Sequence, residues 1–311
     1  MKIYWRSKEG LEAPAGACFS LSPFLPGKAL PISELVQTLP SPTKPIRILK
    51  RIDHPDRAEW TLSVTRALEQ IERGLLQKVV LARETTLILE EAPDPFRVAA
   101  ALSTEGAALF CIQLDERRAF LGATPERLFR REGQMIWTEA LAGTRKRGDQ
   151  GLLHSEKNLR EFQFVQDYLA ETLAPHCAGP VEFTPIGIHQ TPSVEHLHSR
   201  GSAQLIPSIS EGTLLEALHP TPALCGTPKK EALHWISCTE PFARQFYGGL
   251  IGWSTEEESD WMVAIRCCLL EGRIAKIYTG TGIIAGSHPE AEWNELEAKL
   301  NLYKGIFPCG P

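Results

Sequence analysis

The most constraining feature of the sequence is a series of short apolar strands that are interleaved with helices in no regular βαβ rhythm, so that hairpin-like neighbours dominate. Residues 108–113 and 119–122 have the pattern of a hairpin around the charged turn 115–118. Further strands are expected at 78–83, 86–89, 135–139, 248–253, 261–270 and 274–278. Hairpin neighbours pair in an antiparallel manner, whereas a regular βαβ rhythm would favour a parallel sheet. The sequence therefore predicts an α+β fold with mostly antiparallel sheets.

Helical periodicity predicts the segments that would flank these sheets. Apolar residues recur at helical spacing between residues 59 and 74, and an amphipathic stripe runs through 152–173. Further helices are expected at 96–102, from near residue 229, and from 289 to about 303, with Ser287 as a candidate N-cap of the last one. Two glycine-containing segments, 143–151 and 280–282, are expected to be loops.

The first 55 residues are punctuated by prolines, which exclude one long helix or a central strand. We expect this segment to supply edge strands and loops of the same domain, and residues 56–311 to form the catalytic domain. The segment carries no recognisable chemistry, and the sequence shows no repeat of fixed period.

Charge and cysteine usage limit the partners and the location. A net charge of −5 argues against a nucleic-acid-binding coat, and no apolar run approaches the roughly 18 residues of a membrane span. The eight cysteines contain no C-x-x-C pair and lie mostly among apolar residues, as structural free thiols do. Free thiols favour a reducing compartment. With no secretion signal at the start, we expect a cytoplasmic protein that binds neither nucleic acid nor membrane, and a monomer.

Acidic side chains on two expected helices could bind a hard cation. Glu292, Glu295 and Lys299 share one helix face because of their i, i+3 and i+4 spacing, and Glu161 lies on the helix expected at 152–173. Mg²⁺ prefers oxygen ligands and usually takes one or two protein carboxylates. A solvated surface with an ion pair is the alternative that composition favours.

Basic groups beside apolar strands are a second candidate feature. Lys78 and Arg266 each adjoin a run that looks buried, where a charge is costly unless it is paired. Each could pair with a structural carboxylate or receive an anionic ligand. Glu126 could cap a turn, and His196 with His198 is weak evidence for a metal. The residues alone do not name the reaction.

Nine ordered segments resemble the chorismate-utilising enzymes, and within them the isochorismate synthases. They are KVVLAR at 78–83, LGATPERL at 121–128, EALAGTR at 139–145, KNLRE at 157–161, HPTPA at 219–223, YGGLIG at 247–252, AIR at 264–266, GTGII at 280–284 and SHPEAEW at 287–293. The resemblance spans about residues 60–305. It implies two packed, mostly antiparallel sheets flanked by helices, as in anthranilate and aminodeoxychorismate synthases, with the active site between the sheets.

The same resemblance implies a Mg²⁺-dependent conversion of chorismate to isochorismate. Lys78 would be the general base that activates water for attack at C2, and Glu126 the general acid that protonates the departing C4 hydroxyl. Glu161 and Glu295 would hold Mg²⁺, with Glu292 beside them. The positions that match the family's substrate-binding residues are Thr144, His196, Ala223, Tyr247, Arg266, Gly280 and Lys299.

Departures from relatives discriminate among activities in the family. Aminodeoxychorismate synthases place a nucleophilic lysine where this chain has Ala142, and anthranilate and salicylate synthases usually carry threonine at the position of Ala223. Asn158 replaces an acidic residue of several relatives, and the N-terminal region is short for the family. The alternatives are a salicylate synthase, which adds pyruvate elimination, an anthranilate synthase component, and a non-catalytic chorismate-binding subunit.

Overall fold

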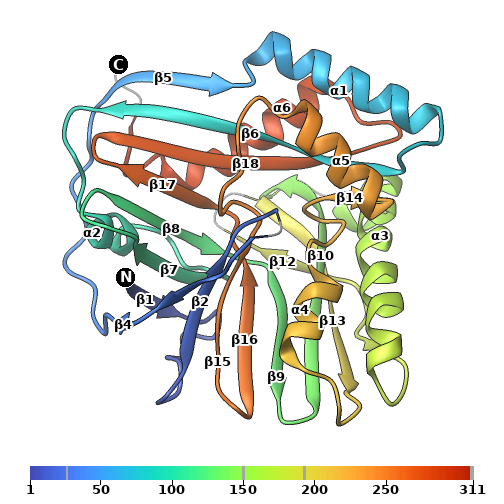
Figure 1. Ribbon diagram of the computed structural model, residues 1–311. Helices are drawn as coiled ribbons and strands as arrows, with labels where there is room; N and C mark the ends of the chain where they lie inside the picture. The colour runs from blue at the N-terminus through green and yellow to red at the C-terminus, as the bar shows by residue number, and fades with distance from the viewer. Residues whose placement is uncertain (26, 149–150, 192–193, 309–311) are drawn as a thin grey trace.

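The computed structural model describes residues 1–25, 27–148, 151–191 and 194–308. In this part of the chain the strands form two nine-stranded sheets. Apart from the parallel pair β1–β4, neighbouring strands are antiparallel. Figure 1 shows β6 (Lys78–Leu89), β18 (Ile274–Ile284) and β17 (Cys267–Glu271) crossing the upper part of the molecule. Below them, at a steep angle, run β9 (Arg127–Glu132), β10 (Met135–Lys146), β13 (Val194–Gln204), β15 (Leu250–Ser254) and β16 (Glu258–Val263). The predicted fold class is confirmed.

The first sheet has its strands in the order β14 (Gly226–Thr227), β6 (Lys78–Leu89), β18 (Ile274–Ile284), β17 (Cys267–Glu271), β8 (Arg118–Thr124), β7 (Ala108–Gln113), β1 (Lys2–Arg6) and β4 (Glu34–Leu35), with β5 (Ile48–His54) also paired to β6. The second has the order β11 (Glu182–Phe183), β13 (Val194–Gln204), β10 (Met135–Lys146), β9 (Arg127–Glu132), β16 (Glu258–Val263), β15 (Leu250–Ser254), β2 (Cys18–Ser22) and β3 (Leu30–Ile32), with β12 (Gly187–Gln190) paired to β13. The first 55 residues thus contribute strands to both sheets.

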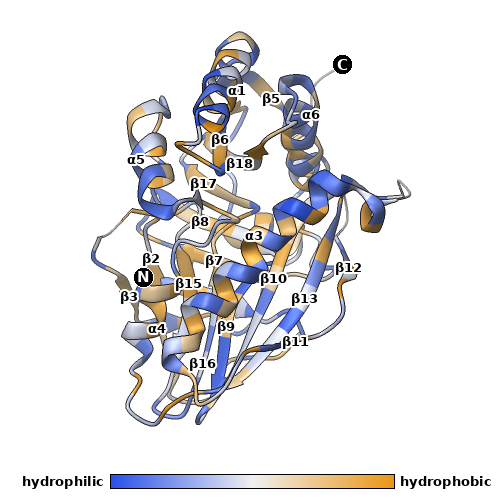
Figure 2. Ribbon diagram, turned by 90° about the vertical axis from the view of Figure 1, so that its right-hand side faces the viewer, coloured by the Kyte–Doolittle hydropathy of each residue, from blue (hydrophilic) through white to orange (hydrophobic). Residues whose placement is uncertain are grey.

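Six α-helices are present among the described residues: α1 (Arg57–Glu72), α2 (Pro95–Ala100), α3 (Glu156–Leu173), α4 (Glu211–Leu218), α5 (Lys229–Thr239) and α6 (Pro289–Leu300). Short 3₁₀ turns lie at Leu152–His154, Ala174–His176 and Asn301–Tyr303. Figure 2 shows α1, α3 and α6 with both hydrophilic and hydrophobic residues, as expected for helices with one buried face. Helix α4 and the full length of β13 were not expected from the sequence.

The core consists of three apolar clusters. One lies between the two sheets and includes Phe19, Phe110 and Ile251. A second packs α1, α3, α4, α5 and α6 against both sheets, and a third covers the other face of the first sheet. No helix in the described segments is long and apolar enough to cross a membrane. The cysteines that the structure describes are free, as expected.

The prediction of one strand at 261–270 is wrong, because this apolar run divides between the two sheets. Strand β16 ends at Val263, and β17 begins at Cys267 in the other sheet. Arg266, between them, has a φ of 50°, in the left-handed region that bulky residues seldom occupy. An apolar run gives no sign of which sheet each of its halves joins.

The predictions of loops at 143–151 and 280–282 are also wrong, because strands run into the first segment and through the second. Strand β10 continues to Lys146, and Gly143, with a φ of 69°, sits at a bulge in its pairing with β13; residues 149–150 of that expected loop lie outside the described residues. Gly280 and Gly282 lie within β18, which pairs with β6 as far as Ile284. The N-cap of α6 is His288, and the Ser287 hydroxyl instead accepts a hydrogen bond from the Ile284 backbone N–H.

Candidate active site

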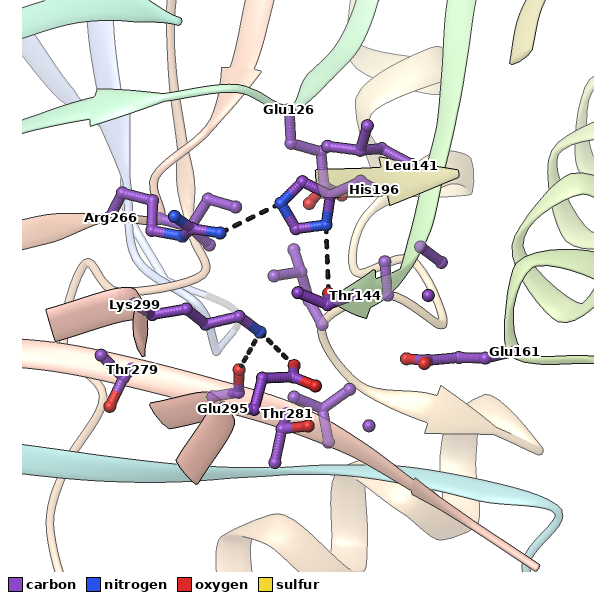
Figure 3. Close-up of a pocket in the computed structure, with 18 of the residues that line it drawn as sticks. Glu126, Leu141, Thr144, Glu161, His196, Arg266, Thr279, Thr281, Glu295 and Lys299 are labelled. Atoms are coloured by element: carbon purple, nitrogen blue, oxygen red, sulfur yellow. Dashed lines mark hydrogen bonds and ion pairs between the residues drawn. The ribbon is translucent and has the colours of Figure 1, made fainter. Parts of the chain in front are cut away.

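A pocket lies where the two sheets and helices α3 and α6 meet. Figure 3 shows side chains from these elements converging on it. The predicted site residues that line the pocket are Glu126, Thr144, Glu161, His196, Ala223, Tyr247, Arg266, Gly280, Glu295 and Lys299. They are spread from residue 126 to residue 299, so the fold brings together what the sequence keeps apart.

Arg266 enters the pocket from the connection that changes sheet. Its left-handed backbone is costly by roughly 1–3 kcal/mol, and the structure holds it through its carbonyl oxygen. That oxygen accepts hydrogen bonds from the Tyr303 hydroxyl at 3.1 Å and from the Ala123 N–H at 3.3 Å. A strained arginine at this point directs a guanidinium into the pocket (Figure 3).

His196 connects Arg266 to Thr144. Arg266 Nη2 donates to His196 Nε2 at 3.1 Å, and His196 Nδ1 lies 3.0 Å from the Thr144 hydroxyl. Burial, together with the positive charge of Arg266, lowers the pKa of His196 well below its usual value, so the imidazole is neutral. Since Nε2 accepts from the guanidinium, the ring proton is on Nδ1 and is donated to Thr144.

Helix α6 contributes a lysine and a carboxylate one turn apart. Lys299 Nζ donates to Glu295 Oε1 at 2.6 Å and to the Gly280 carbonyl at 2.7 Å, as Figure 3 shows. Burial opposes ionisation of Glu295, but the Lys299 ammonium keeps its pKa below the ordinary value. The third predicted carboxylate, Glu292, is not among the lining residues: it pairs with Lys157 and accepts a hydrogen bond from Thr281 at 2.7 Å.

Lys78 lies behind the pocket wall. Its side chain is fully buried, and its Nζ is 3.0 Å from Glu161 Oε1 on α3. A Cβ at Gly282 would stand 2.3 Å from Glu161 Oε1 and 2.7 Å from Lys78 Cε, and one at Gly280 would stand 2.3 Å from the Tyr247 hydroxyl oxygen. The glycines are therefore needed because pocket side chains lie directly against β18, and a turn does not explain them.

Glu126 follows β8 at the opposite side of the pocket and is 7% exposed. Burial raises its pKa to about 7, and the charge of Glu139 acts in the same direction. The positive charges of Lys78, Lys8 and Lys299 oppose the shift. A carboxyl with this pKa is available as a proton donor near neutral pH.

The carboxylates suit a hard cation held by two protein ligands. Glu161 and Glu295 both line the pocket, from α3 and α6. Within the described ranges, no group of three or more His, Cys, Asp or Glu side chains is arranged to hold a metal. Mg²⁺ commonly takes one or two carboxylates and completes its shell with water and substrate oxygens, so the pair fits it. His198 contacts Glu139 at 3.2 Å and is not directed at a metal shared with His196.

Some lining residues were not singled out from the sequence: Val80, Leu141, Gly143, Leu224, Ile265, Tyr278, Thr279, Thr281 and Gly282. Most of them lie inside a matching segment, next to a residue that was singled out. Tyr278, Thr279 and Leu224 lie just outside those segments. Extending each segment by one or two residues would have found all three.

Comparisons with known proteins identify the family of this chain. A family model described as "Chorismate binding enzyme" matches residues 30–305. The chain is 38% identical over 288 residues to isochorismate synthase 2, chloroplastic, of Arabidopsis thaliana, with 88% of this chain and 51% of that protein covered. It is 34% identical over 291 residues to isochorismate synthase, chloroplastic, of Catharanthus roseus, with 89% and 50% covered. The chain thus spans about half the length of these relatives.

A solved structure has the same architecture. MenF, the menaquinone-specific isochorismate synthase from Escherichia coli, superposes with a TM-score of 0.86 at 25% identity, with 98% of this chain and 88% of that chain covered. The two antiparallel sheets and their helices are therefore shared over nearly all of this chain.

Replacing Gly282 with alanine should separate Lys78 from Glu161, because the new Cβ occupies the space of both. We expect the rate on chorismate, the substrate that the resemblance implies, to fall roughly 100-fold. Steady-state kinetics would measure it, with circular dichroism to confirm folding. Gly179→Ala is the matched control, since a Cβ there meets nothing within 4 Å. An unchanged rate in Gly282→Ala would show that the close approach has no role.

The raised pKa of Glu126 should make stability depend on pH. Below about pH 4.5 the carboxyl is protonated in both folded and unfolded chains, and as pH rises toward 7 the unfolded chain ionises first. The free energy of unfolding of the wild type should therefore fall by about 3 kcal/mol relative to Glu126→Gln between pH 4.5 and pH 8. Urea denaturation across this range measures it. Exposed Glu257→Gln is the control, and parallel curves for wild type and Glu126→Gln would contradict the burial argument.

Proposed function

This chain belongs to the chorismate-binding enzyme family, and from its pocket we propose that it is an isochorismate synthase, an isomerase that converts chorismate to isochorismate. The observation that carries the proposal is Glu126, a buried carboxyl with a pKa of about 7 in a pocket that also holds cationic groups. This arrangement suits the protonation of a leaving hydroxyl on an anionic substrate.

The positive groups of the pocket match a substrate with two carboxylates. Chorismate carries one carboxylate on its ring and one on its enolpyruvyl side chain. Arg266 enters the pocket from the connection between β16 and β17, and Lys299 enters it from α6. Arg266 remains cationic because its lowered pKa is still about 10. Neutral His196 leaves the charge of Arg266 available to an anion. We assign Arg266, Tyr247 and the backbone of Gly280 to the enolpyruvyl carboxylate, and Lys299 with Thr144 to the ring carboxylate end.

The reaction needs a base and an acid on opposite sides of the ring. Lys78 removes a proton from water as the water oxygen bonds to C2. The ring double bonds shift, the C4–O bond breaks, and Glu126 gives its proton to the departing hydroxyl, which leaves as water. One water enters and one leaves, so the product is an isomer of the substrate. Lys78 lies on β6 of the first sheet, and Glu126 lies in the connection between β8 of the first sheet and β9 of the second.

Glu161 and Glu295 would hold Mg²⁺, and Glu292 lies beside Glu295 on α6. When bound, the cation would offset the negative charge of the ring carboxylate and fix the orientation of the ring. The Lys299 ammonium, which pairs with Glu295, keeps that carboxylate ionised and available to a cation.

The test is to incubate the purified protein with chorismate and Mg²⁺ and to separate isochorismate, salicylate and anthranilate by chromatography. We expect isochorismate from the wild type and none from Lys78→Ala, because the variant lacks the base. Salicylate would instead indicate a salicylate synthase, and anthranilate formed with ammonia would indicate an anthranilate synthase component. No product from a folded wild-type protein would indicate a chorismate-binding subunit.

Glu295→Gln should weaken Mg²⁺ binding, because an amide is a poorer ligand than a carboxylate and leaves Lys299 unpaired. We expect the Mg²⁺ concentration for half-maximal activity to rise at least about tenfold. Titration calorimetry with Mg²⁺ gives a second readout that does not depend on turnover. Glu290→Gln is the control on the same helix, since Glu290 is exposed and pairs with Arg57. Identical titrations for wild type and Glu295→Gln would remove Glu295 from the metal site.

A further inference from the structure

A buried ion pair joins the N-terminal segment to the second sheet near Glu126. Lys8 follows β1 of the first sheet, and its Nζ is 2.5 Å from Glu139 Oε2 on β10 of the second sheet. The two side chains are only 7% and 3% exposed. The pair therefore bridges the sheets in a region from which water is largely excluded, and its charges are weakly screened.

Glu139 also connects this pair to the chain next to Glu126. Its Oε1 accepts from Arg127 Nη1 at 3.1 Å, and its Oε2 lies 3.2 Å from His198 Nε2. Arg127 directly follows Glu126 in the sequence and pairs further with Asp260 at 2.8 Å and with Glu9 at 2.8 Å. We call Lys8, Glu9, Arg127, Glu139, His198 and Asp260 the rear network. None of these six residues lines the pocket, and through Arg127 the network holds the backbone next to Glu126.

Ionisable groups face Glu126 from every neighbouring element. The basic ones are Lys78 on β6, Lys299 on α6, Lys8 after β1, Arg127 on β9 and Arg266 between β16 and β17. The acidic ones are Glu139 on β10 and, across the pocket, Glu161 and Glu295. Neutral His196 on β13 also lines the pocket. Of these, Lys78, Lys299, Arg266, Glu161 and Glu295 are assigned above to substrate, metal or base. Lys8, Glu139 and Arg127 have no such assignment, and Arg127 is held by Glu9, Glu139 and Asp260.

The fold does not by itself require this pair. A buried ion pair seldom stabilises a protein more than apolar side chains of similar volume would, because both charges lose their hydration. The charges of Lys8 and Glu139 act on Glu126 in opposite directions: Lys8 favours the carboxylate, and Glu139 favours the protonated carboxyl. The pair can thus balance the charge state of Glu126 without contact with the substrate.

We propose that Lys8 and Glu139 are positioning residues that set the pH range over which Glu126 can donate its proton. The proposal rests on the proposed function, in which Glu126 is the general acid. The N-terminal segment, which showed no chemistry in the sequence, thereby contributes a charge to the catalytic site. A general acid must be protonated, so the alkaline limb of the rate profile follows the titration of Glu126.

The two charges predict opposite displacements of that limb. Lys8→Met removes a positive charge and should move the alkaline limb of kcat/KM for chorismate to higher pH by about half a unit or more. Glu139→Gln removes a negative charge and should move it to lower pH by a similar amount. Lys8→Arg keeps the charge and should restore the wild-type profile. Lys2→Met is the matched control, because Lys2 lies on β1, the strand that Lys8 follows, in an exposed pair with Glu34.

A direct titration separates this inference from the proposed function. With side-chain ¹³C-labelled glutamate, the Glu126 carboxyl signal is identified by its absence in Glu126→Gln, and its midpoint is followed in each folded variant. Midpoints displaced upward in Lys8→Met and downward in Glu139→Gln would support the inference even if chorismate were not converted. Unmoved midpoints, or displacement in the same direction in both variants, would overturn it. Thermal melting of each variant identifies any that fails to fold, and Lys8→Arg then remains as the charge-conserving comparison.

Discussion

The pairing of β6 with β18 is the constraint on which the site depends. Their register runs from Ile274 opposite Ile88 to Ile284 opposite Lys78, so the base candidate comes to lie beside Gly282 of β18. Side chains at those glycine positions would collide with Glu161 and Tyr247. One strand pair therefore determines how close α3 and the Tyr247 segment can approach. The absence of side chains at Gly280 and Gly282 therefore shapes the pocket as much as the surrounding side chains do.

The fold class and most helices could be predicted because they depend on local periodicity and hairpin neighbours. The wrong predictions concern segments whose local sequence pattern is compatible with two different tertiary structures. Glycines at 280–282 are typical of turns but also of strands that other side chains approach closely. The apolar run 261–270 gave no sign that Arg266 would divide it between the sheets. Such distinctions depend on contacts between distant segments.

The candidate site was predictable chiefly from its resemblance to a family, since the residues alone left a cation site and buried bases unexplained. The structure brings most of those residues to one pocket and places Lys78 behind its wall. The rear network could not have been found in this way. Lys8, which follows β1 of the first sheet, and Glu139, on β10 of the second, are separated by 131 residues, and no spacing rule joins them. Their proximity follows only from how the sheets pack.

The position of Arg266 between the sheets has a consequence for folding. The residue just before its connection, Val263, belongs to one sheet, and Cys267 just after it belongs to the other, so the guanidinium is correctly placed only when both sheets have docked. An anion bound to it would stabilise the docked state against separation of the sheets as well as against unfolding of either one. A ligand in the pocket would then hold the two sheets together, and it would slow both their local separation and proteolysis at the interface between them.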